Sequence, residues 1–135
     1  MLYIALPPLY KLQKGKVMQY AWTDEELAEL AKKACEEVNP EIQVFRGRIV
    51  SGDQFISDQD VKKKIAQNFD GYCTEMEGAS IAQTAHLNKV PFVVIRAISD
   101  KADDSATMDY PAFERLAVEH SVRLVKKLME YLSAA

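Results

Sequence analysis

The stretch that decides the fold is DGYCTEMEGASIAQTAHLNKVPFVVIRAISD, residues 70–100. Within it, TEME (residues 74–77) fits the S/T-x-x-E capping box, so we predict a helix that begins near Met76. The sequence NKVP (residues 88–91) is a predicted stop for this helix. Residues 90–95 are almost wholly apolar and rich in β-branched side chains. That pattern predicts a strand covered on both faces of a parallel α/β sheet.

Polar residues follow the predicted strand at once. Arg96, Ser99 and Asp100 lie directly after it, and ligands collect at the carboxyl ends of strands in open α/β sheets. These residues indicate a ligand site, with a solvated loop and an internal salt bridge as the alternative. Glu75 and Glu77 flank the start of the preceding helix. Capping accounts for one of these carboxylates but not for both.

Three segments carry a resemblance to a known family. They are GDQFISD (residues 52–58), TEMEGASIA (residues 74–82) and VPFVVIRAISDKAD (residues 90–103). In this order they resemble the C-terminal half of the 5′-methylthioadenosine/S-adenosylhomocysteine nucleosidases, which belong to the purine nucleoside phosphorylase superfamily. The similarity extends from about residue 31 to the C-terminus. It implies a reduced, incomplete three-layer αβα sandwich with a mostly parallel or mixed sheet.

The resemblance implies hydrolysis of the N-glycosidic bond between adenine and a 5′-thio-substituted ribose. An enzyme of this kind neutralises the leaving base and stabilises a ribosyl cation. The position that matches the family's general acid is Asp100, whose carboxyl would need a pKa raised by desolvation to stay protonated near neutral pH. By the same resemblance, Ser99 orients Asp100, and Arg96 helps to order the attacking water.

The remaining matched positions are implied to hold the nucleoside. Glu77 would accept hydrogen bonds from the ribose hydroxyls, and Met76 would pack on the ribose. Phe55 would stack on the adenine ring, while the backbone of Ile56 would hydrogen-bond the base edge. Glu75 matches the family pattern without a defined role. From the residues alone, the Phe55 side chain is expected to pack into the hydrophobic core. No cofactor and no metal are implied.

The first thirty residues carry a second resemblance. MLYIALPPLYKLQKGKVMQY (residues 1–20) predicts a short strand over residues 2–6 and a basic hairpin that turns at Gly15. With the following YAWTDEELAEL, this segment resembles the Toprim region of type IIA topoisomerase B subunits. That family's acidic, Mg²⁺-holding clusters are not in this sequence. We interpret residues 1–135 as one domain, either a chimera of two families or a chain with a familiar-looking edge strand and loop.

The nucleosidase resemblance also predicts what is missing. The family's N-terminal half supplies the first strands of the sheet, a glycine-rich turn and the glutamate that activates water, and no counterpart precedes Glu41. The alternative function is therefore a folded but catalytically inactive α/β module. Sheet strands without neighbours attract pairing with other chains. Because the family also forms homodimers, we expect a homodimer.

Composition excludes several classes of partner. A net charge of −3 and a pI near 5.4 argue against a nucleic-acid interface. No apolar run approaches the length of a transmembrane helix, and no signal peptide is evident, so we expect a cytoplasmic protein without a membrane partner. Cys35 and Cys73 have no partners at ligand spacing, which predicts reduced thiols.

The rest of the chain predicts further helices and a strand. They are a helix opened by a capping box at residues 23–26 and stopped at residues 39–40, a strand or strand pair over residues 42–50 with a bend at Gly47, a basic amphipathic helix over residues 58–69, and a last helix opened by Asp109 and Pro111. His86 and His120 are expected to be packed or partly exposed side chains without a functional role.

Overall fold

A computed structural model describes residues 24–98 and 111–134 in full, and the backbone of residues 2–5, 9–13, 16–21 and 110. Ser99 and Asp100, two of the three expected catalytic residues, lie outside them.

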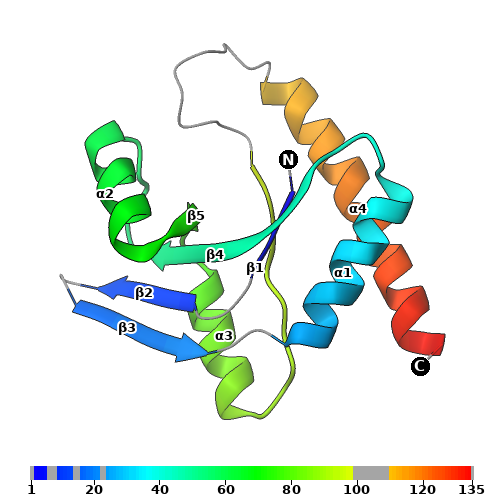
Figure 1. Cartoon of the computed structure of the whole chain (residues 1–135), viewed down its shortest axis with the longest axis horizontal. Helices are drawn as coiled ribbons and strands as arrows, with labels where there is room; N and C mark the ends of the chain where they lie inside the picture. The colour runs from blue at the N-terminus through cyan, green and yellow to red at the C-terminus, as the bar shows by residue number, and fades with distance from the viewer. Residues whose placement is uncertain (1, 6–8, 14–15, 22–23, 99–109, 135) are drawn as a thin grey trace.

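The described part contains six strands and four helices (Figure 1). In chain order they are β1 (Leu2–Ala5), β2 (Leu9–Gln13), β3 (Lys16–Ala21), α1 (Glu25–Val38), β4 (Val44–Gly52), α2 (Gln59–Phe69), β5 (Gly71–Glu75), α3 (Gly78–Leu87), β6 (Ile95–Ala97) and α4 (Tyr110–Ala134). None of these helices combines the length and the hydropathy that a membrane span needs.

The strands form one mixed sheet with β4 at its centre. β1, β2 and β5 all pair with β4 in parallel, whereas β3 is antiparallel to β2 and β6 is antiparallel to β1. The expected mixed sheet and the N-terminal hairpin are confirmed, and the hairpin's turn at Gly15 lies outside the described residues. The N-terminal strand is not separate from the rest, because β1 lies between β4 and β6.

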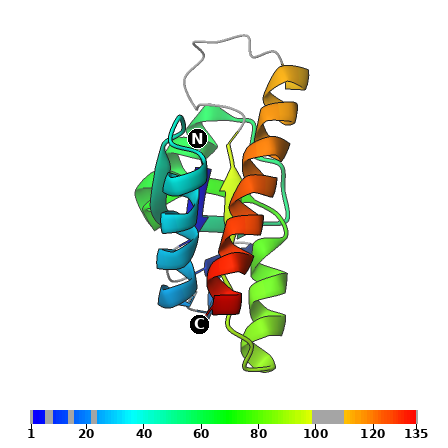
Figure 2. The ribbon, with the colours of Figure 1, turned by 90° about the vertical axis from the view of Figure 1, so that its right-hand side faces the viewer.

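Helices cover both faces of the sheet, which confirms the three-layer sandwich. Val93 and Ile95 pack into the cluster that α1 forms with α4. Phe92 and Val94, alternating with them, pack on the opposite side against Ile49 and an alanine of α3. Figures 1 and 2 both show α1 and α4 side by side, and in Figure 1 α3 lies on the other side of β1 from them. The segment over residues 92–97 is therefore extended and covered on both faces, as its apolar run indicated.

The predicted parallel strand over residues 90–95 is wrong in its extent and its direction. Only Ile95–Ala97 forms a strand, and it runs antiparallel to β1, with Leu2 opposite Ala97. The ladder is short because β1 has four residues, of which three pair with β6. An apolar run indicates burial on both faces, but it does not reveal which neighbour supplies the hydrogen bonds.

The two capping boxes are also corrected. Asp24 is the N-cap of α1, and its side chain accepts a hydrogen bond from the Leu27 N–H at 2.9 Å. Thr74 lies in β5, a strand the sequence did not predict, and α3 begins at Gly78 rather than near Met76. Pairing with β4 keeps the backbone extended through Glu75 and so delays the helix. Because α2 begins after Asp58 and α3 ends at Leu87, the predicted start of the one helix and stop of the other are confirmed.

Candidate functional site

The sequence-predicted site centres on the place where β4 and β5 end together. Because these strands are parallel, Ser51 lies opposite Glu75 at their carboxyl ends. The chain leaves β4 into the loop that holds Phe55 and Ile56, and leaves β5 through Met76 into α3. Ser51 and residues 75–79 are called the β4–β5 corner below.

Buried side chains hold the start of α3 at the β4–β5 corner. Glu75 is only 6% exposed, and its Oε2 accepts hydrogen bonds from the backbone N–H groups of Glu77 at 2.9 Å and Gly78 at 2.5 Å. Ser51 Oγ accepts a third, from the Ala79 N–H at 3.2 Å. A carboxylate is favoured here because the first N–H groups of a helix are unpaired and its N-terminus is electropositive. The capping role of Glu75 leaves its other oxygen, Oε1, buried and without a partner among the described residues.

Gly78 is required for this arrangement. A Cβ at Gly78 would lie 2.8 Å from Oε1 of Glu75 and 3.0 Å from its carboxyl carbon. Sequence reasoning missed both Gly78 and Ser51. The available signal was a glycine immediately after the Glu-Met-Glu sequence, which marks a close approach of backbone and side chain.

The corner presents Met76 and Glu77 to solvent. Glu77 is exposed and makes no side-chain hydrogen bond to the helix, and Met76 is also exposed. The two carboxylates expected at this point therefore differ in kind: Glu75 is internal and structural, while Glu77 is free to meet a ligand. Across the corner, Phe55 is 83% exposed, so its interpretation as a core plug is wrong. Ile56 is partly buried beside it in sequence.

Arg96 lies on the same face of the sheet as Glu75. Side chains alternate along the extended segment, and Phe92 and Val94 face α3, so Arg96 follows on that face. Its charge and that of Glu75 both act on the Cys73 thiol. Arg96 Nε is buried and has no hydrogen-bond partner in the described part of the chain.

The structure does not bring all the expected residues to one end of the sheet. β6 runs opposite to β1, and β1 runs parallel to β4. The chain that follows Arg96 therefore leaves β6 at the end of the sheet where β4 begins, whereas Ser51 and Glu75 lie where β4 and β5 finish. Met76, Glu77 and Phe55 follow the two strand ends at the corner; Ser99 and Asp100 lie outside the described residues.

Cys73 should be an unreactive thiol. Burial raises its pKa to about 11, an effect that the nearby Arg96 charge reduces and the Glu75 charge increases. At pH 8 we expect alkylation by iodoacetamide about 100-fold slower in the folded chain than in the urea-unfolded chain, because the thiolate is the reactive form. Peptide mass spectrometry separates Cys73 from Cys35.

The same shift predicts a pH dependence of stability. The unfolded thiol, with a pKa of about 8.5, loses its proton before the folded one does. The contribution of Cys73 to the free energy of unfolding should therefore decrease as the pH rises from about 8.5 to about 11, the pKa of Cys73 in the folded state. Alkylation of Cys73 at the rate of the unfolded chain at pH 8 would contradict both expectations.

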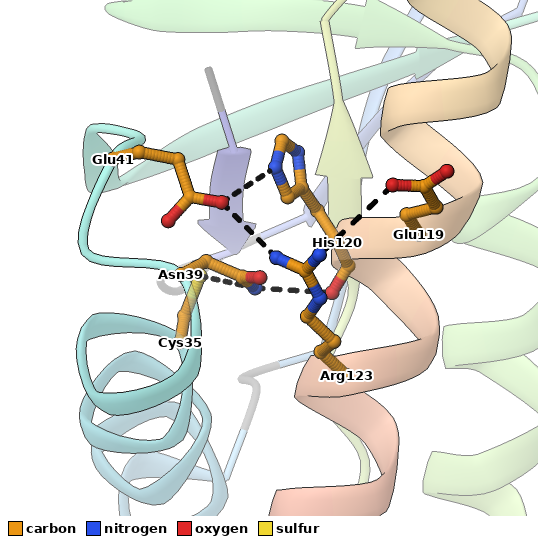
Figure 3. A network of polar contacts seen from close by, with 6 residues as sticks. All are labelled: Cys35, Asn39, Glu41, Glu119, His120 and Arg123. Carbon is orange, nitrogen blue, oxygen red and sulfur yellow. Dashed lines mark hydrogen bonds and ion pairs between the residues drawn. The ribbon is translucent and has the colours of Figure 1, made fainter.

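A second polar cluster joins α1 to α4 (Figure 3). Asn39, fully buried after the end of α1, donates from Nδ2 to the backbone carbonyl of His120 at 3.0 Å. It also contacts Cys35 Sγ at 3.7 Å. Glu41 Oε1 lies within hydrogen-bond distance of His120 Nε2, at 3.0 Å, and accepts a hydrogen bond from Arg123 Nη1 at 3.1 Å.

This cluster has a structural role. Burial raises the pKa of the Cys35 thiol. The His120 ring contacts Glu41 and not this thiol. No group of three metal-ligating side chains occurs in the part of the chain that the structure describes. The expectation of a packed His120 is confirmed, with its side chain 14% exposed.

Asn39→Ala should lower the free energy of unfolding by about 1 kcal/mol, since it removes the buried hydrogen bond that joins the end of α1 to α4. The matched control is Asn88→Ala. Asn88 also follows a helix end, and it donates to the Thr84 carbonyl at 2.8 Å, but it is exposed. We expect its replacement to cost less than about 0.5 kcal/mol. Equal losses in urea denaturation would show that the inter-helix bond adds nothing.

Comparisons with known proteins place these features in one family. A family model described as "Phosphorylase superfamily" matches residues 6–130. The 5′-methylthioadenosine/S-adenosylhomocysteine nucleosidase of Shewanella loihica is 41% identical over 110 residues, which are 81% of this chain and 47% of that protein. The nucleosidase of the same name from Bacillus anthracis is 40% identical over 110 residues, again 81% of this chain and 47% of that protein.

Solved structures agree with this assignment. The 5′-methylthioadenosine/S-adenosylhomocysteine nucleosidase of Campylobacter jejuni superposes with a TM-score of 0.81 at 30% identity, covering 96% of this chain and 61% of that one. A futalosine hydrolase of Helicobacter pylori gives a TM-score of 0.77 at 29% identity, covering 96% of this chain and 60% of that one. The chain thus spans about half the length of the curated relatives it matches. The family match takes in most of the Toprim-like segment, for which the chimera interpretation stays a prediction.

Proposed function

The chain belongs to the phosphorylase superfamily, and from that premise we propose that it holds the substrate in the hydrolysis of the N-glycosidic bond of 5′-methylthioadenosine or S-adenosylhomocysteine. The products are adenine and the thioribose. The observation that carries this proposal is the β4–β5 corner, where a buried Glu75 fixes the start of α3 and leaves Glu77 free. The relatives that bear this name support the substrate class.

In the proposed complex the corner binds the ribose and the base. Glu77 accepts hydrogen bonds from the ribose hydroxyls, and its negative charge lies near the developing ribosyl cation. Met76 packs on the sugar. Phe55, exposed in the loop after β4, stacks on the adenine ring, and the Ile56 backbone meets the base edge. Aromatic stacking of this kind suits a flat, weakly polar ring system.

The leaving base requires a proton. We assign this step to Asp100, which delivers its proton to adenine N7 while the C–N bond breaks, so that the bonding electrons pass to the purine. Ser99 orients Asp100, and Arg96 orders the water whose oxygen bonds to the ribosyl carbon; this water releases its proton to solvent as the bond forms. This assignment requires residues 99–100 to reach a nucleoside bound at Glu77. The antiparallel direction of β6 makes that the most demanding part of the proposal.

Adenine release from 5′-methylthioadenosine tests the proposal. Glu77→Gln should lower kcat/KM by about 10- to 100-fold, since a hydrogen bond to a charged group contributes about 1.5–3 kcal/mol. Asp100→Asn should abolish release. Glu26→Gln is the matched control, because Glu26 is an exposed carboxylate in the first turn of α1. A Glu77→Gln variant as active as the wild type would overturn the role of the corner.

A second candidate function is a folded module that binds the nucleoside without hydrolysing it. The direction of β6 favours it, because the chain after Arg96 leaves the sheet at the end opposite the corner. This candidate predicts no adenine release but a raised Tm in the presence of adenine. A ligand at one hundred times its Kd stabilises the folded state by about 2.7 kcal/mol. Release of adenine that Asp100→Asn abolishes would exclude it.

A further inference from the structure

The strand β5 carries one residue more than the stretch of β4 that it pairs with. Gly71 lies opposite Arg48. The next pair is Cys73 and Ile49, so Tyr72 is an additional residue of β5 at this point. An additional residue on one strand is a β-bulge, which re-aims the side chains that follow it. The bulge lies between the end of α2 and the β4–β5 corner (Figure 1).

The side chains around the bulge show its effect. In a regular strand, consecutive side chains point to opposite faces of the sheet. Tyr72 and Cys73 are consecutive, yet they share a face. The Tyr72 ring lies against Gly47, and Cys73 packs with Ile49 in the cluster that α3 covers. Gly47 and Ile49, two positions apart on β4, belong to the same face.

The additional residue decides on which face Glu75 lies. With it, Glu75 is opposite Ser51 and two positions after Cys73, so its carboxylate reaches the start of α3. Without it, Thr74 would lie opposite Ser51. Glu75 would then point to the other face, because a shift of one residue turns every following side chain over. The first N–H groups of α3 would lose their buried acceptor.

Gly47 makes room for the bulge. A Cβ at Gly47 would lie 2.5 Å from Cδ2 and 2.6 Å from Cγ of Tyr72, closer than such atoms pack. These atoms are at the root of the ring, so rotation of a flexible end cannot relieve the contact. Glycine within a strand often marks a place where another group approaches closely. At Gly47 that group is the side chain of the bulged residue.

Arg48 fixes the point at which β5 begins. Its Nη1 donates a hydrogen bond to the backbone carbonyl of Phe69, the last residue of α2. A single residue, Asp70, separates Phe69 from β5, and it adopts a left-handed conformation with φ of 50°. Aspartate tolerates this conformation better than most residues do. Because the connection is so short, the bond from Arg48 also sets where β5 meets β4.

We propose that Gly47 and Arg48 are positioning residues for the candidate site, because they hold the bulge at Tyr72. The bulge makes Glu75 the internal cap of α3 and leaves Glu77 toward the nucleoside. Both residues precede the corner on β4, so they act through Glu75 and not by contact with the ligand. The role of Glu77 in this inference rests on the proposed function, whereas the register of β5 does not.

Amide hydrogen exchange of the isotopically labelled chain, measured by NMR without ligand, tests the register. Gly47→Ala should displace Tyr72 and, through it, Glu75. The amides of Glu77 and Gly78, called the corner amides below, should then exchange about tenfold faster, because their buried acceptor moves away. Amides of α1 should keep their wild-type rates. A general loss of stability would speed exchange in α1 as well.

Two further variants identify the cause. Gly52→Ala is the matched control on the same strand, and it should leave the exchange rates unchanged, because no atom of the described chain lies within 4 Å of the added Cβ. Tyr72→Ala combined with Gly47→Ala removes the ring that the new Cβ meets, so it should restore most of the protection. Unchanged corner amides in Gly47→Ala, or no recovery in the double variant, would overturn the role of Gly47.

Arg48→Met tests the second positioning residue, and it decides the question if Gly47→Ala does not fold. Methionine keeps the length of the side chain but has no donor for the Phe69 carbonyl, so the corner amides should exchange about fivefold faster. Arg48→Lys retains a donor and should recover part of the protection. The matched control is Arg46→Met, since Arg46 lies two residues earlier on β4 and pairs with Glu25 and Glu29 of α1. Equal rates in the two methionine variants would overturn the role of Arg48.

Binding of 5′-methylthioadenosine separates this inference from the proposed function. Gly47→Ala should raise the Kd by about tenfold, and Gly52→Ala should not change it. A wild type that binds no nucleoside would overturn the proposed function, while the exchange rates still decide the register. A wild-type Kd in a Gly47→Ala variant whose corner amides exchange faster would overturn the claim that the bulge positions Glu77.

Discussion

Gly78→Ala is expected to lower the free energy of unfolding by about 2 kcal/mol and to weaken nucleoside binding. The added Cβ would lie 2.8 Å from Oε1 of Glu75, closer than such atoms pack. Relief requires the buried carboxylate to move, which breaks its hydrogen bonds to the N–H groups of Glu77 and Gly78. A buried acceptor and two helix donors left unsatisfied cost about 1–3 kcal/mol. Urea denaturation measures the loss.

The matched control for this change is Gly52→Ala. Gly52 ends β4 near the same corner, but no atom lies within 4 Å of the place a Cβ would take. We expect a change in stability within about 0.5 kcal/mol. If both substitutions cost the same, the contact between Gly78 and Glu75 does not hold the corner together.

Leu124→Ala is expected to destabilise the chain by about 3 kcal/mol. Leu124 is 0% exposed and packs with Cys35 of α1, with Ile42, Val44, Ile95 and Ala97 around them. Removal of a fully buried leucine side chain costs about 2–5 kcal/mol, through lost transfer free energy and the cavity that remains. This loss is a large share of the free energy of unfolding of a typical domain, which is about 5–15 kcal/mol.

Leu116→Ala on the same helix separates burial from helix propensity. Leu116 is 47% exposed, so its replacement should change the free energy of unfolding by less than about 0.5 kcal/mol. The urea midpoint should therefore shift strongly for Leu124→Ala and barely for Leu116→Ala. A small shift for Leu124→Ala would mean that α4 does not depend on this cluster.

Much of the fold follows from local sequence patterns. Periodicity and stop signals located α1, α2, α3 and α4, and the apolar run over residues 90–95 correctly indicated cover from both faces. Strand direction could not be predicted in the same way. The antiparallel placement of β6 depends on which strand lies beside it, and β1 is almost one hundred residues away in sequence. The strand β5 was missed because its TEME sequence also fits a helix start.

At the candidate site, the sequence drew attention to the Glu-Met-Glu segment but did not predict how its two carboxylates divide their roles. The Glu-Met-Glu sequence correctly indicated an unusual helix start. Its spacing did not reveal that Glu75 lies inside as the cap while Glu77 lies outside, because the difference arises from the pairing of β5 with β4. Ser51 could not be predicted for the same reason, since its partner Ala79 belongs to a helix that begins 27 residues later. Contacts between side chains on different strands depend on the register of the sheet, and spacing along the sequence does not reveal that register.

Titration of the isotopically labelled chain with 5′-methylthioadenosine, followed by backbone amide NMR, tests the central claim most directly. If the β4–β5 corner binds the nucleoside, the largest amide chemical-shift changes should fall on Phe55, Met76 and Glu77. Glu77→Gln should then raise the fitted Kd by about tenfold or more. Shifts confined to residues outside this corner, or no shifts at about 1 mM nucleoside, would contradict the claim that this corner is the binding site.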